Sequence, residues 1–280
     1  MTSRGGSGPH ESAPAGVQTG MGTVSTARRS GRSRTGGVPT TLPASASSTG
    51  RQLALGIEEA AVPAGRREIL PGAVHVSGWL GFDAQRRLVD EFRRWARPPA
   101  GLRHPRVPTG HLMSVQSVCL GWHWYPYVYS KTADDTDGAP VKPLPDDLAD
   151  MARAAVGAAY GRATQAARTY SPDAAIVNLY SPGARLGLHQ DGEEPSAAPV
   201  VTISLGDTCT FRLAGVARRT GPFTDVQLRS GDLLVFGGPT RRIFHGVPKV
   251  LEETAPEGLG LPPGRLSITV RETGLSSCQC

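Results

Sequence analysis

Two histidines and one aspartate are the side chains best suited to hold a metal ion in this sequence of 280 residues. His189 and Asp191 are two residues apart, and in an extended segment such neighbours point to the same side. His245 is the only histidine that follows them, and it lies in a β-rich stretch. Two imidazoles and one carboxylate form the facial triad of non-haem Fe(II) oxygenases, which leaves positions open for cosubstrate and oxygen. The alternative is a hydrogen-bonded histidine and an aspartate in a turn beside Gly192.

Two arginines flank the last β-rich run and offer a place for an anion. Arg265 and Arg271 are six residues apart, and this even spacing places both on one face of a strand. A buried guanidinium is unfavourable unless it meets an anion, which a dicarboxylate would supply. Six extended residues span roughly 20 Å, so strand curvature and the long side chains must shorten the gap. The alternative is that Arg265 caps the strand and Arg271 faces solvent.

These candidates lie in a region of short β-strands. From residue 173 onward, strand-forming runs alternate with Gly, Pro and Asp turns, and no helical pattern intervenes. Closely spaced strands of this kind indicate an antiparallel sandwich or barrel. The expected strands are residues 175–180, 200–205, 208–213, 225–228, 232–236, 241–245 and 266–270.

Helices are expected before this region. Asp83 is a good N-cap, and apolar residues follow it at helical spacing until Pro98 ends the helix. A second helix is expected from residue 145 or 146 to about Tyr160. Between the two helices, residues 107–130 are aromatic and polar. The apolar face of the first helix is formed by Leu88, Phe92 and Trp95.

Composition excludes several classes of protein. The sequence has no run of about 18 apolar residues, which a membrane helix needs. Its four cysteines are too few and too irregular for a disulfide scaffold. We therefore expect a cytoplasmic protein with no membrane association.

Four segments differ in composition. Residues 1–52 form a basic tail rich in Gly, Ser and Thr, which we expect to be disordered. Residues 53–172 are expected to form a helical lid region, and residues 173–274 the β-rich core. Residues 275–280 are expected to form a C-terminal tail, in which Cys278 and Cys280 are interpreted as an exposed, incidental pair.

The sequence NLYSPGARLGLHQD at residues 178–191 closely resembles the iron-binding segment of the AlkB family of 2-oxoglutarate-dependent nucleic-acid demethylases. Further motifs of that family follow one another across about residues 70–274. They are MSV at 113–115, LGW at 120–122, YVYS at 127–130, VTISLG at 201–206, SGDLLVFGG at 230–238, FHG at 244–246 and the segment 265–271. By this resemblance the fold is α+β and mainly β, with a double-stranded β-helix (jelly-roll) core and an N-terminal helical and nucleotide-recognition lid region.

The resemblance also implies roles for individual residues. The iron ligands would be His189, Asp191 and His245. The contacts to 2-oxoglutarate would be Asn178, Tyr180, Arg265, Ser267 and Arg271. The substrate contacts would be Trp122 stacked on the damaged base, Tyr127 on a phosphate, Glu193 near the base, Arg218 on the nucleic acid, and Met113. The sequence departs from the bacterial pattern at Ser267, Phe236 and Glu193, where that pattern has Asn, Trp and Asp.

The activity implied by the resemblance is oxidative dealkylation with Fe(II), 2-oxoglutarate and O2. We expect a monomer that repairs bases such as 1-methyladenine and 3-methylcytosine in single- or double-stranded DNA, with RNA as a further substrate, and releases formaldehyde, succinate and CO2. One alternative is a hydroxylase of a small molecule, a protein or tRNA. Residues 51–280 permit it, because they hold 25 basic and 23 acidic side chains and are nearly neutral. Another alternative is a non-catalytic sensor of damaged bases, against which the complete ligand set argues.

Overall fold

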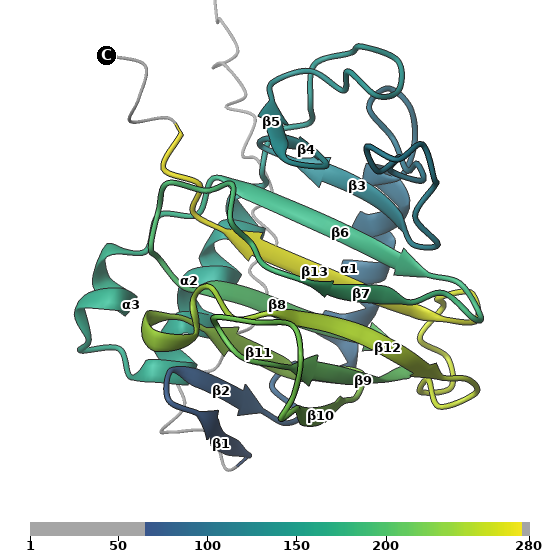
Figure 1. The fold of residues 1–280 in the computed structure, drawn as a ribbon. Helices are drawn as coiled ribbons and strands as arrows, with labels where there is room; N and C mark the ends of the chain where they lie inside the picture. The colour runs from purple at the N-terminus through teal and green to yellow at the C-terminus, as the bar shows by residue number, and fades with distance from the viewer. Residues whose placement is uncertain (1–64, 276–280) are drawn as a thin grey trace, which may run out of the picture. The chain divides into compact units, whose positions relative to one another are not determined.

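The computed structural model describes residues 65–275, so the expectations for residues 1–52, Cys278 and Cys280 fall outside the described part. Within it, helices and two β-sheets form layers (Figure 1). One group of buried side chains lies between the helices and the larger sheet, and a second group lies between the two sheets. Such layering buries the apolar face of every element.

The larger sheet has seven antiparallel strands in the order β1-β2-β11-β8-β13-β6-β3. Strand β13 runs between β8 and β6 in continuous register with both. The inner strands are almost entirely buried, because both faces of this sheet are covered. The strands are β1 Arg66–Leu70, β2 Ala73–Val76, β3 Gln116–Leu120, β6 Ala174–Tyr180, β8 Val200–Gly206, β11 Leu233–Phe236 and β13 Arg265–Arg271.

The smaller sheet has four antiparallel strands in the order β10-β9-β12-β7. Tyr180 and Phe236 from the larger sheet belong to the same buried cluster as Phe211 and Val247 from the smaller one. The strands are β7 Leu186–His189, β9 Thr208–Leu213, β10 Thr224–Leu228 and β12 His245–Leu251. The two packed antiparallel sheets confirm the predicted jelly-roll class.

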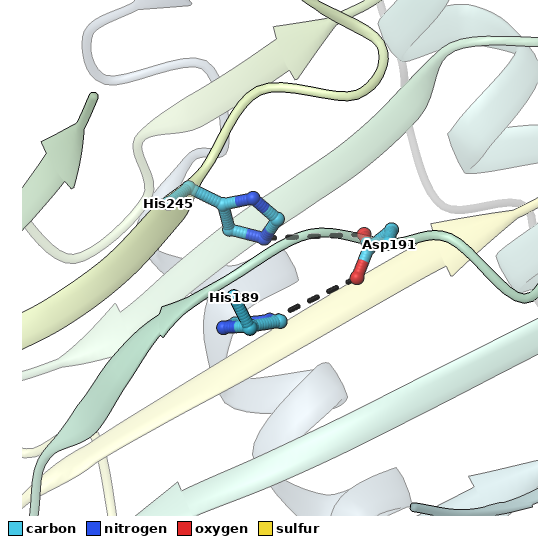
Figure 2. Close-up of side chains that lie close together, drawn as sticks. All are labelled: His189, Asp191 and His245. Atoms are coloured by element: carbon cyan, nitrogen blue, oxygen red, sulfur yellow. Dashed lines mark ion pairs between the residues drawn. The ribbon is translucent and has the colours of Figure 1, made fainter. Parts of the chain in front are cut away.

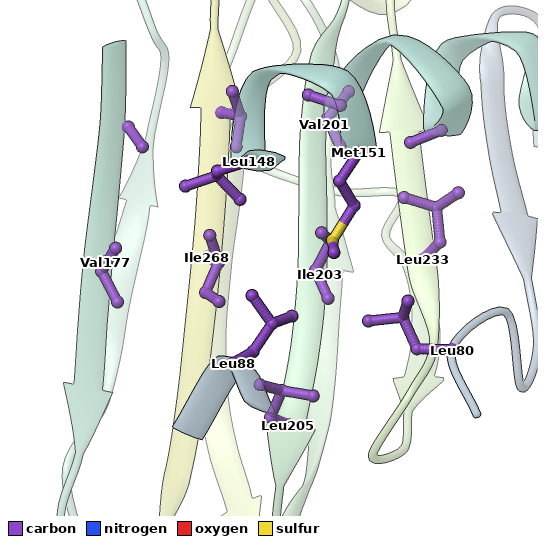
Figure 3. Close-up of a cluster of buried hydrophobic side chains, with 14 of the residues drawn as sticks. Leu80, Leu88, Leu148, Met151, Val177, Val201, Ile203, Leu205, Leu233 and Ile268 are labelled. Carbon is purple, nitrogen blue, oxygen red and sulfur yellow. The ribbon is translucent and has the colours of Figure 1, made fainter. Parts of the chain in front are cut away.

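Helices α1 (Phe82–Trp95) and α2 (Asp146–Tyr160) cover the outer face of the larger sheet. Figure 3 shows Leu88 of α1 and Met151 of α2 against Ile203 and Ile268 of the central strands. The N-cap of α1 is Gly81 and not Asp83, which lies in the first turn, where its negative charge still suits the helix dipole. A short helix, α3, spans Gln165–Thr169. None of the helices in residues 65–275 is long and apolar enough to cross a membrane.

The predicted strand at residues 241–245 is wrong. A 3-10 turn at Gly238–Thr240 comes first, and β12 begins only at His245. Arg241 and Arg242 leave the strand pattern because their side chains turn back and donate to the backbone carbonyl of Asp191. A local sequence pattern does not reveal these long-range partners.

The part of the chain before residue 173 also contains strands, which the sequence analysis did not predict. β2 pairs with β11, and β3 pairs with β6, so the larger sheet crosses the boundary expected at residue 172. A separate hairpin is formed by β4 (His123–Tyr125) and β5 (Val128–Ser130). These strands have three to five residues and depend on distant partners, so their periodicity is too short to detect.

Candidate active site

The three residues predicted to bind metal meet at the open end of the smaller sheet. His189 ends β7, His245 begins β12, and the two residues are directly paired across the strands. Asp191 follows two residues after His189 and turns toward both rings (Figure 2). Its Oδ1 lies 3.8 Å from Nε2 of His189, and its Oδ2 lies 3.9 Å from Nε2 of His245. One ligand atom from each residue therefore lies within 4.8 Å of the others.

Backbone contacts orient both imidazoles. Nδ1 of His189 lies 3.0 Å from the carbonyl oxygen of Gly187, and Nδ1 of His245 lies 3.0 Å from that of Ile243. An Nδ1–H that donates to a carbonyl leaves the Nε2 lone pair free, and this is the usual arrangement of a metal-binding histidine. Oδ2 of Asp191 is buried and accepts no hydrogen bond from the described residues. This nitrogen and oxygen donor set fits a ferrous ion.

The electrostatic surroundings keep Asp191 and His245 in their metal-binding forms. Burial would raise the pKa of Asp191, but the positive charge of Arg271, together with the charge that His245 and His189 carry when protonated in acid, outweighs it and holds this pKa well below its usual range. Burial lowers the pKa of His245 to about 4. Near neutral pH the site therefore offers a carboxylate and a neutral His245 ring, as coordination requires.

A cavity of about 530 Å³ opens beside the triad, between the two sheets. Ser267, Thr269 and Arg271 line it from alternate positions of β13, because residues two apart share one face of a strand. Asn178 and Tyr180 line it from β6 for the same reason. All five of these polar side chains therefore face one space, and four of them are predicted 2-oxoglutarate contacts.

Arg265, the fifth predicted 2-oxoglutarate contact, is fully buried and is not among the residues that line the cavity, but its neighbours Ser267 and Tyr180 are. It donates from Nε to Ser204 and from Nη2 to Ser267, and its guanidinium stands 5.0 Å from the centre of the Tyr180 ring. Its Nη1 has no hydrogen-bond partner, and no ion pair with an acidic residue is found for it in residues 65–275. A buried cation without a counterion calls for an anion, so Arg265 fits a carboxylate of 2-oxoglutarate.

Arg271 lies at the other end of the same strand face, next to the metal ligands. Its Nη2 is 3.1 Å from Oδ2 of Asp191, and its Nη1 donates to Glu194 at 2.6 Å. Its Nε is buried and has no partner among the described residues. The two arginines thus lie at opposite ends of the β13 face, with Ser267 and Thr269 between them.

The outer part of the cavity contains three of the predicted substrate contacts. Met113, Tyr127 and Glu193 all line it. Trp124 of β4 lines it too, although the sequence analysis did not select it. The signal that could have found Trp124 is the crowding of aromatic residues between Trp122 and Tyr129, among which only Trp122 was selected for stacking.

The structure does not bring Trp122 to the cavity. Its side chain is buried, its indole Nε1 donates to the carboxylate of Asp173 at 3.1 Å, and the ammonium of Lys131 lies 3.5 Å from its ring centre. Lys131 therefore covers one face of the Trp122 ring, and Asp173 occupies its polar edge. Trp124, the residue after the buried His123 in β4, is half-buried and lines the cavity instead.

Arg218 also lies away from the cavity lining, on an exposed loop between β9 and β10. Its neighbour Arg219 lines the cavity instead, with its guanidinium 5.5 Å from the ring centre of Phe244. The predicted nucleic-acid contact Arg218 therefore does not line the cavity, whereas the adjacent Arg219 does.

Comparison with known proteins agrees with this geometry. Residues 72–271 match the sequence model of the 2OG-Fe(II) oxygenase superfamily. The chain is 35% identical over 222 residues to the DNA N(6)-methyladenine demethylase ALKBH1D of Arabidopsis thaliana, a match covering 72% of this chain and 50% of that protein. It is 35% identical over 188 residues to the alpha-ketoglutarate-dependent dioxygenase AlkB of Salmonella typhimurium, covering 64% of this chain and 81% of that protein.

A solved structure shows the same architecture. The structure of OsALKBH1 superimposes with a TM-score of 0.66 at 34% sequence identity, and the match covers 74% of this chain and all of that one. The chain spans about half the length of the plant relatives that it matches by sequence.

Proposed function

The chain belongs to the AlkB family within the 2OG-Fe(II) oxygenase superfamily, and from that premise we propose that it removes alkyl groups from nucleic-acid bases by oxidation. The observation that carries the proposal is the single cavity in which a two-histidine, one-carboxylate site, a row of polar 2-oxoglutarate contacts and an aromatic opening follow one another. A cavity without the aromatic opening would support only the cofactor assignment.

His189, Asp191 and His245 would hold Fe(II), and 2-oxoglutarate and O2 would bind next to it in the cavity. Fe(II) bound there would activate O2: one oxygen atom would enter 2-oxoglutarate, which gives succinate and CO2, and the other would hydroxylate an N-methyl group, whose product decomposes to formaldehyde and the repaired base. The polar residues of β6 and β13 orient the keto acid, and Arg265 binds its far carboxylate. Burial between two sheets excludes bulk water from this end of the cavity.

Substrate recognition would fall to the outer end. A methylated pairing edge is hidden inside a duplex, so the base must leave the stack and enter the cavity. Trp124 and Tyr127 offer aromatic surfaces for stacking, and such stacking contributes about 1–3 kcal/mol per base. Glu193 places a carboxylate near a ring that methylation makes cationic, as in 1-methyladenine and 3-methylcytosine.

The decisive experiment supplies Fe(II), 2-oxoglutarate and a panel of oligonucleotides. The panel carries 1-methyladenine, 3-methylcytosine or N6-methyladenine in single-stranded DNA, duplex DNA and RNA, because relatives are named as demethylases of DNA and of tRNA. We expect loss of the methyl group by mass spectrometry together with formaldehyde and succinate, most strongly with single-stranded DNA. The variant His189→Ala is the control.

The same experiment separates the alternatives. Succinate without any change in the oligonucleotides would favour a hydroxylase of a small molecule or protein, which the near-neutral charge of residues 51–280 permits. Tight binding of methylated DNA without succinate would favour a damaged-base sensor. The complete triad and the buried Arg265 favour a catalytic enzyme over a non-catalytic sensor.

The protein is further proposed to act as a monomer in the cytoplasm, without membrane association. The cytoplasmic location is supported by composition, because the few, irregularly spaced cysteines suit a reducing compartment. Light scattering of the purified chain and fractionation of the source cells would test the two parts separately; a stable dimer or a membrane-bound fraction would contradict them.

A further inference from the structure

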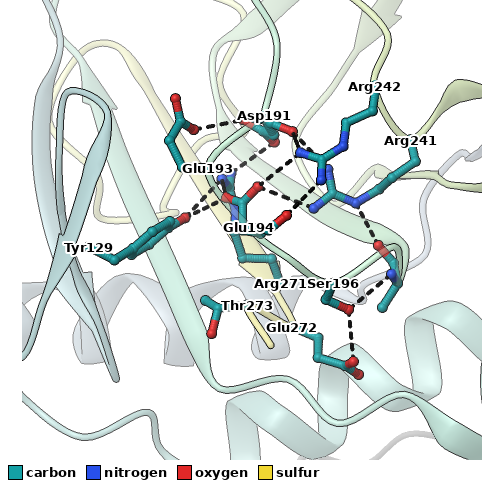
Figure 4. Close-up of polar contacts among 12 residues, drawn as sticks. Tyr129, Asp191, Glu193, Glu194, Ser196, Arg241, Arg242, Arg271, Glu272 and Thr273 are labelled. Carbon is teal, nitrogen blue, oxygen red and sulfur yellow. Dashed lines mark hydrogen bonds and ion pairs between the residues drawn. The ribbon is translucent and has the colours of Figure 1, made fainter. Parts of the chain in front are cut away.

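Glu194 is a buried carboxylate that the proposed mechanism does not use. It lies three residues after Asp191 and is 1% exposed. Its Oε1 accepts from the Tyr129 hydroxyl at 2.5 Å and from Nη1 of Arg271 at 2.6 Å. Its Oε2 accepts from Nη2 of Arg241 at 3.2 Å. Figure 4 shows these partners converging on Glu194 from separate parts of the chain.

The charges around Glu194 show what it balances. Arg241 and Arg271 are both nearly buried, and within residues 65–275 the carboxylates that pair with them are Asp191 and Glu194. If Glu194 lost its charge, Asp191 would be the remaining carboxylate for Arg271. A buried charge that loses its partner seeks the nearest opposite charge.

The hydrogen bonds show how Arg271 is divided between the two carboxylates. Nη1 of Arg271 donates both to Glu194 and, at 3.2 Å, to the oxygen of Tyr129. Nη2 is 3.1 Å from Oδ2 of Asp191, yet that oxygen has no hydrogen bond from any described residue. The directional bonds of Arg271 therefore go to Glu194 and Tyr129, and Asp191 receives only the attraction of the charge.

We propose that Glu194 is a positioning residue that holds Arg271 by Nη1, so that Asp191 keeps an oxygen free for the metal and Nε of Arg271 faces a carboxylate of the cosubstrate. This inference rests on the proposed iron site. Tyr129 belongs to β5, so the same contacts connect the hairpin that carries Trp124 to the metal ligands. Sequence resemblance selected the neighbouring Glu193 for a different role, as a substrate contact, and gave no role to Glu194.

Loss of the negative charge of Glu194 should first weaken the binding of the metal ion. In Glu194→Gln the side chain keeps its size, but its amide nitrogen would face guanidinium donors, so Arg271 would turn to Asp191 and compete with the ion. Substitutions of residues that support metal ligands weaken metal binding by about 10- to 100-fold. We expect a loss of that order for Mn(II), together with a higher KM for 2-oxoglutarate.

The test measures Mn(II) binding to the full chain by calorimetry, in the absence of substrate and cosubstrate, with melting temperatures recorded alongside. Glu252→Gln, on an exposed position after β12, is the matched control and should bind Mn(II) like the wild type. Tyr129→Phe removes one of the two partners of Nη1 and should weaken Mn(II) binding by a smaller factor than Glu194→Gln. This variant tests the proposal even if Glu194→Gln fails to fold.

A double variant separates positioning from general support of the fold. If Glu194 acts by restraining Arg271, then Glu194→Gln should cost no Mn(II) affinity once Arg271 is already Met. Wild-type Mn(II) affinity in both Glu194→Gln and Tyr129→Phe, or an equal loss in the presence and absence of Arg271, would overturn the proposal. A wild type that binds no Mn(II) would overturn it too, whereas a wild type that binds Mn(II) but demethylates nothing would contradict only the proposed function.

Discussion

The inner and outer ends of the cavity are built in different ways. At the inner end, two of the three proposed metal ligands and the proposed 2-oxoglutarate contacts lie on paired strands, with His189 opposite His245 and β13 in continuous register with two neighbours. At the outer end, a two-stranded hairpin and loops carry the aromatic residues. A rigid frame suits the reaction shared by a family, while loops can change with the substrate.

The hairpin at the outer end is nonetheless held in place by hydrogen bonds of Arg103 and His123. Arg103 donates from Nη2 to the carbonyl oxygen of Trp124 and from Nε to Asp135 at 3.1 Å. His123 contacts the same carboxylate at 2.5 Å. At the tip of the hairpin, Tyr127 has a φ of 73°, which is unfavourable for an aromatic residue and is often found at functional sites. The strands of the hairpin are thus fixed by hydrogen bonds, whereas its tip at Tyr127 is strained and exposed.

The largest effect is expected at the inner end. His189→Ala should reduce demethylation by at least about 1000-fold, because it removes metal chemistry that contributes several kcal/mol to the rate. Single-turnover assays and metal analysis would measure it. His111→Ala removes an exposed histidine outside the cavity lining and should leave the rate unchanged. Activity retained in His189→Ala would contradict the metal assignment.

A smaller effect is expected for the buried cation. Arg265→Met keeps much of the volume of the side chain but removes the charge, so the KM for 2-oxoglutarate should rise by about 10- to 100-fold, the value of a charge-assisted hydrogen bond. In the absence of cosubstrate the variant should melt no lower than the wild type, because the removed charge is unpaired. Thermal melts with and without 2-oxoglutarate would show whether only the wild type gains stability. A variant that gains as much as the wild type would exclude Arg265 from the cosubstrate site.

At the outer end, the two tryptophans should separate binding from stability. Trp124→Ala should weaken the binding of methylated single-stranded DNA by about 5- to 150-fold, the value of one stacked base, with the KM for 2-oxoglutarate unchanged. Trp122→Phe loses the bond to Asp173 and should lower the melting temperature while DNA affinity stays within about twofold. Fluorescence anisotropy would measure the affinities. The reverse pattern would restore Trp122 as the stacking residue.

The same contrast explains what the sequence could predict. The inner end follows regular periodicity: the alternation of β13 placed Arg265 and Arg271 on one face, and the predicted strand 208–213 matches β9. Arg265 and Arg271 do not need to meet at one point, because each would bind a different carboxylate of 2-oxoglutarate; their long side chains still have to shorten the separation of roughly 20 Å along the strand. The metal triad was predictable because two of its members are only two residues apart.

The outer end lacks such periodicity. Trp122 is kept from the cavity by its contacts with Asp173 and Lys131. Asp173 is far from the hairpin in sequence, and Lys131 lies outside the hairpin strands. Glu193 and Glu194 are identical neighbours in a loop, so only the tertiary structure reveals which one is buried. Single positions in irregular segments are decided by long-range packing, to which local patterns are blind.

The smallest effect tests how firmly the hairpin is anchored. Burial would raise the pKa of Asp135, but hydrogen bonds from His123 and Arg103 outweigh it and lower this pKa. A lowered pKa stabilises the fold above the ordinary value of about 4, and this contribution is lost as the pH falls through the value in the folded protein. Asp135→Asn should therefore reduce the free energy of unfolding by on the order of 1–2 kcal/mol at pH 7. In urea titrations, the difference in the free energy of unfolding between the wild type and Asp135→Asn should become smaller at acidic pH. Asp90→Asn, which removes an exposed ion pair on α1, should have little effect at any pH. A gap for Asp135→Asn that does not narrow in acid would mean that the charge of Asp135 does not anchor the hairpin.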